Sequence, residues 1–214
     1  FWTEIDKLME QVQYLEFTGG EPFMIQEHFD LLQRMVDQGI ASNLEIHYNT
    51  NGTHFPDHAE SIWKNFKLVE IAFSIDDVGP RFEYQRANAV WDEVNANMDR
   101  FEALRDRNTN IQLQVCSTVN IFNVMYLEGL ANWIDQRNFD FIYWNMLHEA
   151  RHHSVGTLPD RAKELVSNKL MSAKVSNFHM KEFVKIVDFI EAGISLDGTE
   201  LRRSVQQVDR RRSQ

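Results

Sequence analysis

The stretch Tyr14–Pro22 constrains the fold more than any other part of this 214-residue sequence. Its first residues, Tyr-Leu-Glu-Phe, are mostly of the aromatic and apolar types that suit a buried strand. The paired glycines Gly19 and Gly20 permit backbone angles that a Cβ would forbid. Beyond them, apolar residues recur at helical spacing, at Ile25, Phe29, Leu32 and Val36. The stretch therefore predicts a strand, a glycine turn and a helix in succession.

Later segments repeat this unit. Apolar patterns predict strands at 44–48, 68–74, 111–115 and 139–147, and helices at about 57–66, 91–104 and 127–134. Parallel strands require crossover connections, which such helices supply, so the sequence predicts an α/β fold.

Two architectures are compatible with that alternation, an open doubly wound sheet and a barrel or partial barrel. Polar residues follow every predicted strand, which is typical of a barrel whose loops build one site at one face. An open sheet would gather them near a switch point. The sequence therefore favours a partial barrel of the TIM type.

The two ends of the chain differ from this core. Apolar spacing predicts a helix over 5–12 with Thr3 as its N-cap, and such a helix usually follows a strand of its own. We therefore expect a fragment whose barrel lacks its first strand. Helical patterns replace the repeat after residue 150, including one with Pro159 in its first turn. These features predict a core domain over 1–150 and a C-terminal helical extension over 151–214.

Composition limits the classes of partner. A net charge of -10 and a pI near 5.2 argue against general affinity for nucleic acid or anionic membranes. The arginines after residue 201 fit a solvated helix face better than a nucleic-acid contact. No apolar run approaches the roughly 20 residues that span a bilayer, and no signal peptide opens the sequence, so a cytoplasmic protein is expected. Cys116 is the single cysteine, which excludes an internal disulfide.

The glycine turn also predicts a binding site. Backbone N–H groups at paired glycines can approach a ligand closely, and Glu21 adds a negative acceptor suited to an ammonium group. A structural role competes with this interpretation, because an acidic side chain also favours a helix N-terminus.

Two other groups of residues have simpler interpretations. His148, His152 and His153 fit solvated loop histidines better than a metal site, because no acidic residue stands at a recognised spacing. Asp76 and Asp77 fit caps of the following segment better than an acid and base pair.

Four motifs, each at the end of a predicted strand, carry a resemblance to a known family. They are Thr18-Gly-Gly-Glu-Pro22, Asn49-Thr-Asn-Gly-Thr53, Ser74-Ile-Asp-Asp77 with Arg86, and Thr118-Val-Asn120. In order and spacing they resemble the radical SAM superfamily, and most of all its twitch-domain-containing members, in which the segment around 144–148 is similar too. The resemblance covers roughly residues 1–160. It implies a partial (β/α)6 barrel.

The resemblance also implies roles for individual residues. Gly19, Gly20, Glu21 and Pro22 would hold the amino group of S-adenosyl-L-methionine (SAM), while Ser74 and Arg86 would hold its carboxylate. The chemistry of the residues agrees, because the planar fork of Arg86 matches a carboxylate. Asn51 would touch the cofactor or the substrate. The implied wall residues near the adenine or ribose are Thr118, Val119, Asn120 and Leu147.

The implied reaction is reductive cleavage of SAM by a [4Fe–4S] cluster, which yields a 5′-deoxyadenosyl radical that abstracts hydrogen from a substrate, often a peptide or protein. The sequence departs from the family here, since it lacks the CxxxCxxC motif and Cys116 cannot replace it. The expected explanation is truncation, with the cluster cysteines upstream of Phe1, no catalytic residue within the fragment, and an unknown electron donor. Two alternatives remain: a non-catalytic domain that binds a SAM-like ligand and, more distantly, a metal-dependent barrel hydrolase.

Overall fold

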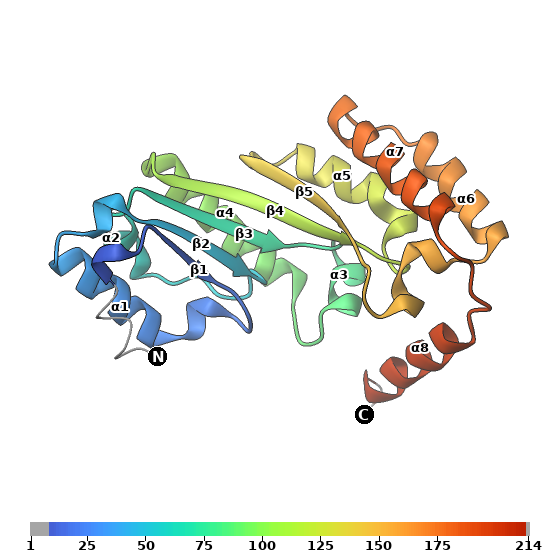
Figure 1. The fold of residues 1–214 in the computed structure, drawn as a ribbon, viewed down its shortest axis with the longest axis horizontal. Coiled ribbons are helices and arrows are strands. Elements are labelled where there is room, and N and C mark those ends of the chain that lie inside the picture. The colour runs from blue at the N-terminus through green and yellow to red at the C-terminus, as the bar shows by residue number, and fades with distance from the viewer. Residues whose placement is uncertain (1–8, 213–214) are drawn as a thin grey trace. The chain divides into compact units, whose positions relative to one another are not determined.

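A computed structural model describes residues 9–212 and shows an α/β fold built on one sheet (Figure 1). Five strands lie in the order β1-β2-β3-β4-β5. They are β1 Tyr14–Phe17, β2 Glu45–Thr50, β3 Leu68–Ser74, β4 Ile111–Val119 and β5 Phe141–Met146. The first four pair in parallel. Residues 140 and 147 donate backbone hydrogen bonds to residues 113 and 119, so β5 also runs parallel to β4.

Helices connect and follow the strands. The α-helices are α1 Gln26–Asp37, α2 Ala59–Trp63, α3 Pro80–Gln85, α4 Trp91–Arg107, α5 Leu127–Asp135, α6 Asp160–Met171, α7 Asn177–Ala192 and α8 Thr199–Arg212. Short 3₁₀ turns occupy Met9–Gln11, Pro22–Met24, Ala41–Asn43, Val124–Tyr126, Arg151–His153 and Val155–Thr157. In the described part of the chain, none of the helices has both the length and the apolar character needed to cross a membrane.

The strand order decides between the two predicted architectures. Each described strand lies beside its neighbour in sequence, so the sheet has no point at which the order reverses. A doubly wound sheet requires such a reversal, whereas a barrel does not. The prediction of an α/β fold with a parallel sheet is confirmed, and the order is consistent with a partial barrel. A missing first strand, and a boundary at residue 150 with a helical extension after it, stay predictions.

The chain folds as two compact units. The first takes the chain up to Ile75, then Phe82–Cys116 and Asn138–Tyr143. The second takes Asp76–Arg81, Ser117–Arg137 and the chain from Trp144 onward.

The core of the first unit lies on one face of β2 and β3. Tyr48, on β2, is fully buried, and its ring lies 5.4 Å from that of Trp63 on α2 and 4.9 Å from that of Phe23. On β3, Phe73 meets the ring of Phe101 from α4 at 5.2 Å. The alternating burial of β2 places its odd-numbered residues on the opposite face, which therefore carries the polar side chains.

The core of the second unit contains a polar network. Trp144 Nε1 donates to His179 Nδ1 at 3.1 Å, and the other ring nitrogen of His179 lies 3.0 Å from Asp135 Oδ1. These contacts join β5, α7 and α5. Burial lowers the pKa of His179, although the carboxylate of Asp135 opposes that shift.

Several predictions about individual elements need correction. The strand at 14–17 is present but not buried, since Tyr14 is 48% exposed at the outer described strand of the sheet. The turn predicted at 74–80 runs into α3, and β4 extends to Val119 rather than ending at 115. Pro159 precedes α6 as its N-cap instead of lying in its first turn. The first half of the predicted helix over 5–12, with Thr3 before it, falls outside the described residues, and the second half shows only the 3₁₀ turn Met9–Gln11.

Candidate functional site

Glu21 lies at the centre of the site in the first unit. It is the N-cap of the 3₁₀ turn Pro22–Met24, and its Oε1 accepts from Phe23 N at 3.4 Å. The same oxygen accepts from Thr50 Oγ1 at 2.8 Å, and Oε2 accepts from Asn51 N at 3.0 Å. The carboxylate therefore joins the glycine turn to the carboxyl end of β2.

This bonding leaves Glu21 able to accept one more donor. A carboxylate offers about four lone-pair positions, and the described residues occupy three of them. Both the capping role and a ligand-binding role are therefore compatible with the geometry. Pro22, next to Glu21, is buried, whereas Gly19 and Gly20 are exposed.

The glycines of the turn adopt conformations that other residues avoid. Gly19 has φ +87° and Gly20 φ +61°, and an added Cβ at either would meet nothing within 4 Å. Space is therefore available at both positions, and only the left-handed backbone requires glycine.

Replacing Gly20 by alanine is expected to lower the free energy of unfolding by about 1–2 kcal/mol, the cost of a left-handed conformation for a residue with a Cβ. Urea unfolding measures this change. The matched control is Gly129→Ala, because Gly129 lies in α5, also has open space around it and has an ordinary φ. That change should raise stability by about 0.5–1 kcal/mol. Equal effects at the two positions would contradict the backbone argument.

The turn after β2 forms one wall of a hollow of about 410 Å³. Asn51 Oδ1 accepts from Thr53 N at 2.8 Å and from Thr53 Oγ1 at 2.6 Å, which holds the turn closed. Gly52 has φ +75°, and a Cβ there would lie 3.1 Å from Val94 Cγ1. The packing of this turn against α4 therefore sets the position of Asn51.

Arg86 also lines the hollow, together with residues 87–89. It follows α3, its backbone N–H donates to Phe82 O at 2.9 Å, and its guanidinium lies 5.7 Å from the centre of the Phe82 ring. Ser74, the last residue of β3, is half-buried and does not line this hollow. The structure thus brings Glu21, Asn51 and Arg86 to one part of the first unit, with Ser74 at the end of the strand that pairs with β2.

The predicted residues of the second unit lie at the end of β4 and just after β5. Thr118 is half-buried, Val119 is fully buried with its side chain in the core, and Leu147 N donates to Val119 O at 3.2 Å. Asn120 Oδ1 accepts from Phe122 N at 2.8 Å, so this side chain shapes the loop after β4.

Sequence reasoning missed two side chains that hold these loops. Thr50 is buried and bonds Glu21. Asn123 is also buried, and its amide donates to Asp76 O at 2.7 Å and Thr118 O at 2.9 Å. In the sequence, each is only a polar residue near the end of a predicted strand. That pattern does not by itself reveal a partner distant in sequence.

The two adjacent aspartates serve structural roles. Asp77 is buried and accepts from Arg81 Nε at 2.9 Å and Val78 N at 2.8 Å. Burial raises its pKa, while the two donors oppose that shift. Asp76 Oδ1 accepts from Thr118 N at 2.8 Å. Asp77 thus bonds the segment that follows it, as the capping interpretation expects, whereas Asp76 instead holds the end of β4.

Among the described residues, no group of three His, Cys, Asp or Glu side chains is placed to hold a metal ion.

Comparisons with known proteins place this site in context. Residues 3–132 match the family model described as the radical SAM superfamily. No curated protein matches the chain.

Solved structures of anSMEcpe share the fold. One with bound AdoMet matches at a TM-score of 0.55 and 15% identity, covering 91% of this chain and 53% of that one. One with bound AdoMet and a Cp18Cys peptide matches at a TM-score of 0.51 and 15% identity, covering 89% and 55%. This chain therefore spans about half the length of the structures that it resembles.

Proposed function

The chain belongs to the radical SAM superfamily, and from that premise we propose that it forms the SAM-binding core of an enzyme that abstracts hydrogen from its substrate. The observation that carries the proposal is the position of Glu21. Its carboxylate is held between the glycine turn and Asn51, retains capacity for one more donor, and lies on the turn next to a hollow that Arg86 lines.

The donors and acceptors of the first unit fit the methionine end of SAM. The carboxylate of Glu21 and the backbone C=O groups of Gly19 and Gly20 would accept from the ammonium end, with the buried Pro22 fixing the turn. Arg86 would bind the carboxylate through paired N–H donors, assisted by Ser74. Since Asn51 Oδ1 already bonds Thr53, the amide N–H₂ of Asn51 is the group that would meet the cofactor or the substrate.

The residues of the second unit are a separate proposal. Thr118, Asn120 and Leu147 would form wall contacts to the adenine or ribose of SAM. Val119 would contribute only backbone atoms, because its side chain is buried.

When bound beside a reduced [4Fe–4S] cluster, SAM supplies a 5′-deoxyadenosyl radical. The residues of this chain do not fit the cluster itself, since Cys116 is its one cysteine and such clusters take several thiolates. Catalysis by this scheme would need cluster ligands from residues outside the printed sequence. We therefore expect the 214-residue chain alone to be inactive.

For the substrate we propose a peptide or protein. The anSMEcpe structure that contains a peptide supports this choice by analogy of fold. The similarity of the 144–148 segment supports a place among the twitch-domain-containing members. A cytoplasmic setting also stays a proposal.

A second candidate is a domain that binds SAM without radical chemistry. The single cysteine favours it, because nothing in the printed sequence replaces the cluster motif. The two candidates differ in one measurement. The full-length protein, made without oxygen, should show cluster absorption and form 5′-deoxyadenosine. SAM binding without either signal would favour the second candidate.

Replacing Arg86 by alanine is expected to weaken SAM binding by about tenfold, as removal of a charge-assisted hydrogen bond usually does. Calorimetric titration of the 214-residue chain with SAM measures the change. Arg107→Ala is the control, because Arg107 is exposed on α4 and bonds Glu60 instead. If the Arg86 variant and the wild type bind SAM with equal affinity, Arg86 does not bind SAM.

A further inference from the structure

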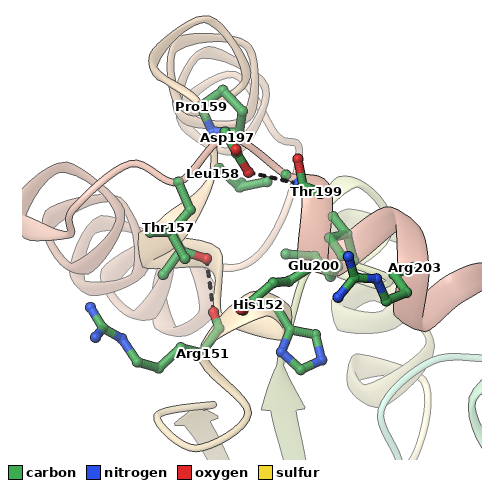
Figure 2. Close-up of a pocket in the computed structure, with 13 residues that line it drawn as sticks. Arg151, His152, Thr157, Leu158, Pro159, Asp197, Thr199, Glu200 and Arg203 are labelled. Carbon is green, nitrogen blue, oxygen red and sulfur yellow. Dashed lines mark hydrogen bonds between the residues drawn. The ribbon is translucent and has the colours of Figure 1, made fainter.

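The second unit contains a cavity of about 590 Å³ that none of the residues proposed above lines. Its walls come from the loops around Thr157 and Asp197 and from the first turns of α8 (Figure 2). Only one lining residue, Ile121, falls within the stretch 3–132 that matches the superfamily model. The cavity therefore belongs to a part of the chain where loops can set specificity.

The walls are held in place by hydrogen bonds. Thr157 Oγ1 donates to Arg151 O at 2.8 Å, and Leu196 N donates to Thr157 O at 3.0 Å. On the side of α8, Ser204 Oγ lies 3.1 Å from His153 Nε2. Such contacts reduce the ordering that a ligand would have to impose.

The lining combines apolar surface with charges of both signs. The apolar residues are Ile121, Leu158, Pro159, Leu196 and Leu201. The charged residues are Arg151 and Arg203, with Asp197 and Glu200 of opposite sign, and Figure 2 shows Glu200 and Arg203 on α8. The formal charges of these four side chains cancel.

This lining disfavours several ligand classes. Phe, Tyr and Trp are absent from the lining residues and His152 is the one aromatic ring among them, so the cavity offers less stacking surface than a base usually occupies. Balanced charges do not suit a polyanion, and the described residues form no metal-binding group. An aliphatic side chain would match the apolar lining, while the adjoining polar groups of a peptide would match the charged rim. The volume lies within the roughly 300–1,000 Å³ of ligand pockets.

We propose that this cavity docks an extended peptide segment of the substrate through one aliphatic side chain, with Arg203 facing an acidic neighbour of that side chain. The proposal rests on the proposed function, because it assumes that the substrate is a peptide or protein.

Fluorescent nonapeptide pools test this proposal. One pool fixes Leu at the centre and Glu beside it, a second replaces that Leu by Ser, and a third replaces that Glu by Lys. Fluorescence polarisation with the 214-residue chain should show that the first pool binds about tenfold more tightly than the second, because only leucine buries apolar surface. Arg203→Glu should transfer the preference from the pool with Glu to the pool with Lys.

A second test variant lies on α8, and its control lies on α6. Leu201→Asp, in the cavity, should weaken binding of the first pool about tenfold. Leu165→Asp should not weaken it, because Leu165 is 59% exposed and outside the cavity. Arg161→Glu, also exposed, should leave the preference between Glu and Lys unchanged. Since Leu201→Asp can disturb α8, the exposed Arg203 gives the independent readout.

Failure of this proposal is distinguishable from failure of the proposed function. SAM binding without any difference between the pools, or with no effect of Arg203→Glu, would overturn the docking cavity alone. If inorganic phosphate abolishes peptide binding, the cavity is an anion site and the docking proposal is wrong. Peptide binding without SAM binding would support the cavity and count against the SAM site.

Discussion

Replacing Glu21 by glutamine is expected to weaken SAM binding by about 100-fold, the largest effect of any single change in the site. The substitution keeps the shape of the side chain and removes its negative charge. A hydrogen bond to a charged group contributes about 1.5–3 kcal/mol, and the partly buried position of Glu21 limits solvent screening. The ammonium of SAM would lose that partner.

Calorimetric titration of the 214-residue chain with SAM measures this loss. Glu27→Gln is the control, because Glu27 is an exposed carboxylate in the first turn of α1. Urea unfolding of the variant shows whether the link to β2 also weakens. An unchanged affinity for SAM in a folded Glu21→Gln variant would contradict the role of Glu21 on which the proposed function depends.

Acidification is expected to destabilise the first unit through His28. This side chain is buried, its Nδ1 lies 2.6 Å from Ile25 O, and its Nε2 lies 3.2 Å from the Tyr48 hydroxyl. Burial lowers the pKa of His28 to about 4, against a usual 6.5, and His58 contributes in the same direction while Asp30 and the bond to Ile25 oppose it.

The sign of the effect follows from proton linkage. Because the folded pKa lies below the unfolded one, the unfolded chain binds the proton first as the pH falls. The free energy of unfolding should therefore decrease as the pH falls below about 6.5, and the contribution of His28 to this decrease should end near pH 4. The total loss from a shift of this size is about 3 kcal/mol. Between pH 6.5 and 5 the expected loss is about 2 kcal/mol.

Urea unfolding of the wild type and of His28→Gln at pH 7.5, 6.5 and 5 isolates this contribution. The variant should lose about 2 kcal/mol less than the wild type between pH 6.5 and 5, since it carries no titrating ring. His54→Gln removes an exposed histidine and should follow the wild type. Identical pH dependence in wild type and His28→Gln would rule out His28 as a source of acid sensitivity.

Much of the fold could be predicted because its signals are local. The strand over 68–74 was predicted with its observed bounds, and the helices near 26–37 and 91–107 followed from apolar spacing. The exposure of Tyr14 could not be predicted, because side-chain type indicates a strand but not its place in the sheet. The length of β4 was underestimated since Ser117 and Thr118 interrupt the apolar pattern near its end.

The candidate site shows the same division. The glycine turn, Asn51 and Arg86 stand at recognisable positions beside predicted elements, so the sequence singled them out. Thr50 was missed because its importance arises only when β2 carries its hydroxyl to within 2.8 Å of Glu21, 29 residues earlier.

By itself, the sequence determined which residues form strands and helices and which chemical groups follow them, because periodicity and turn chemistry act over a few neighbouring residues. Only the tertiary structure decided that Glu21 bonds the end of β2, that Asp76 accepts from Thr118 N, and that a cavity opens beside α8. Those outcomes depend on contacts between residues far apart in the chain, and they exist only when packing of the core brings the segments together.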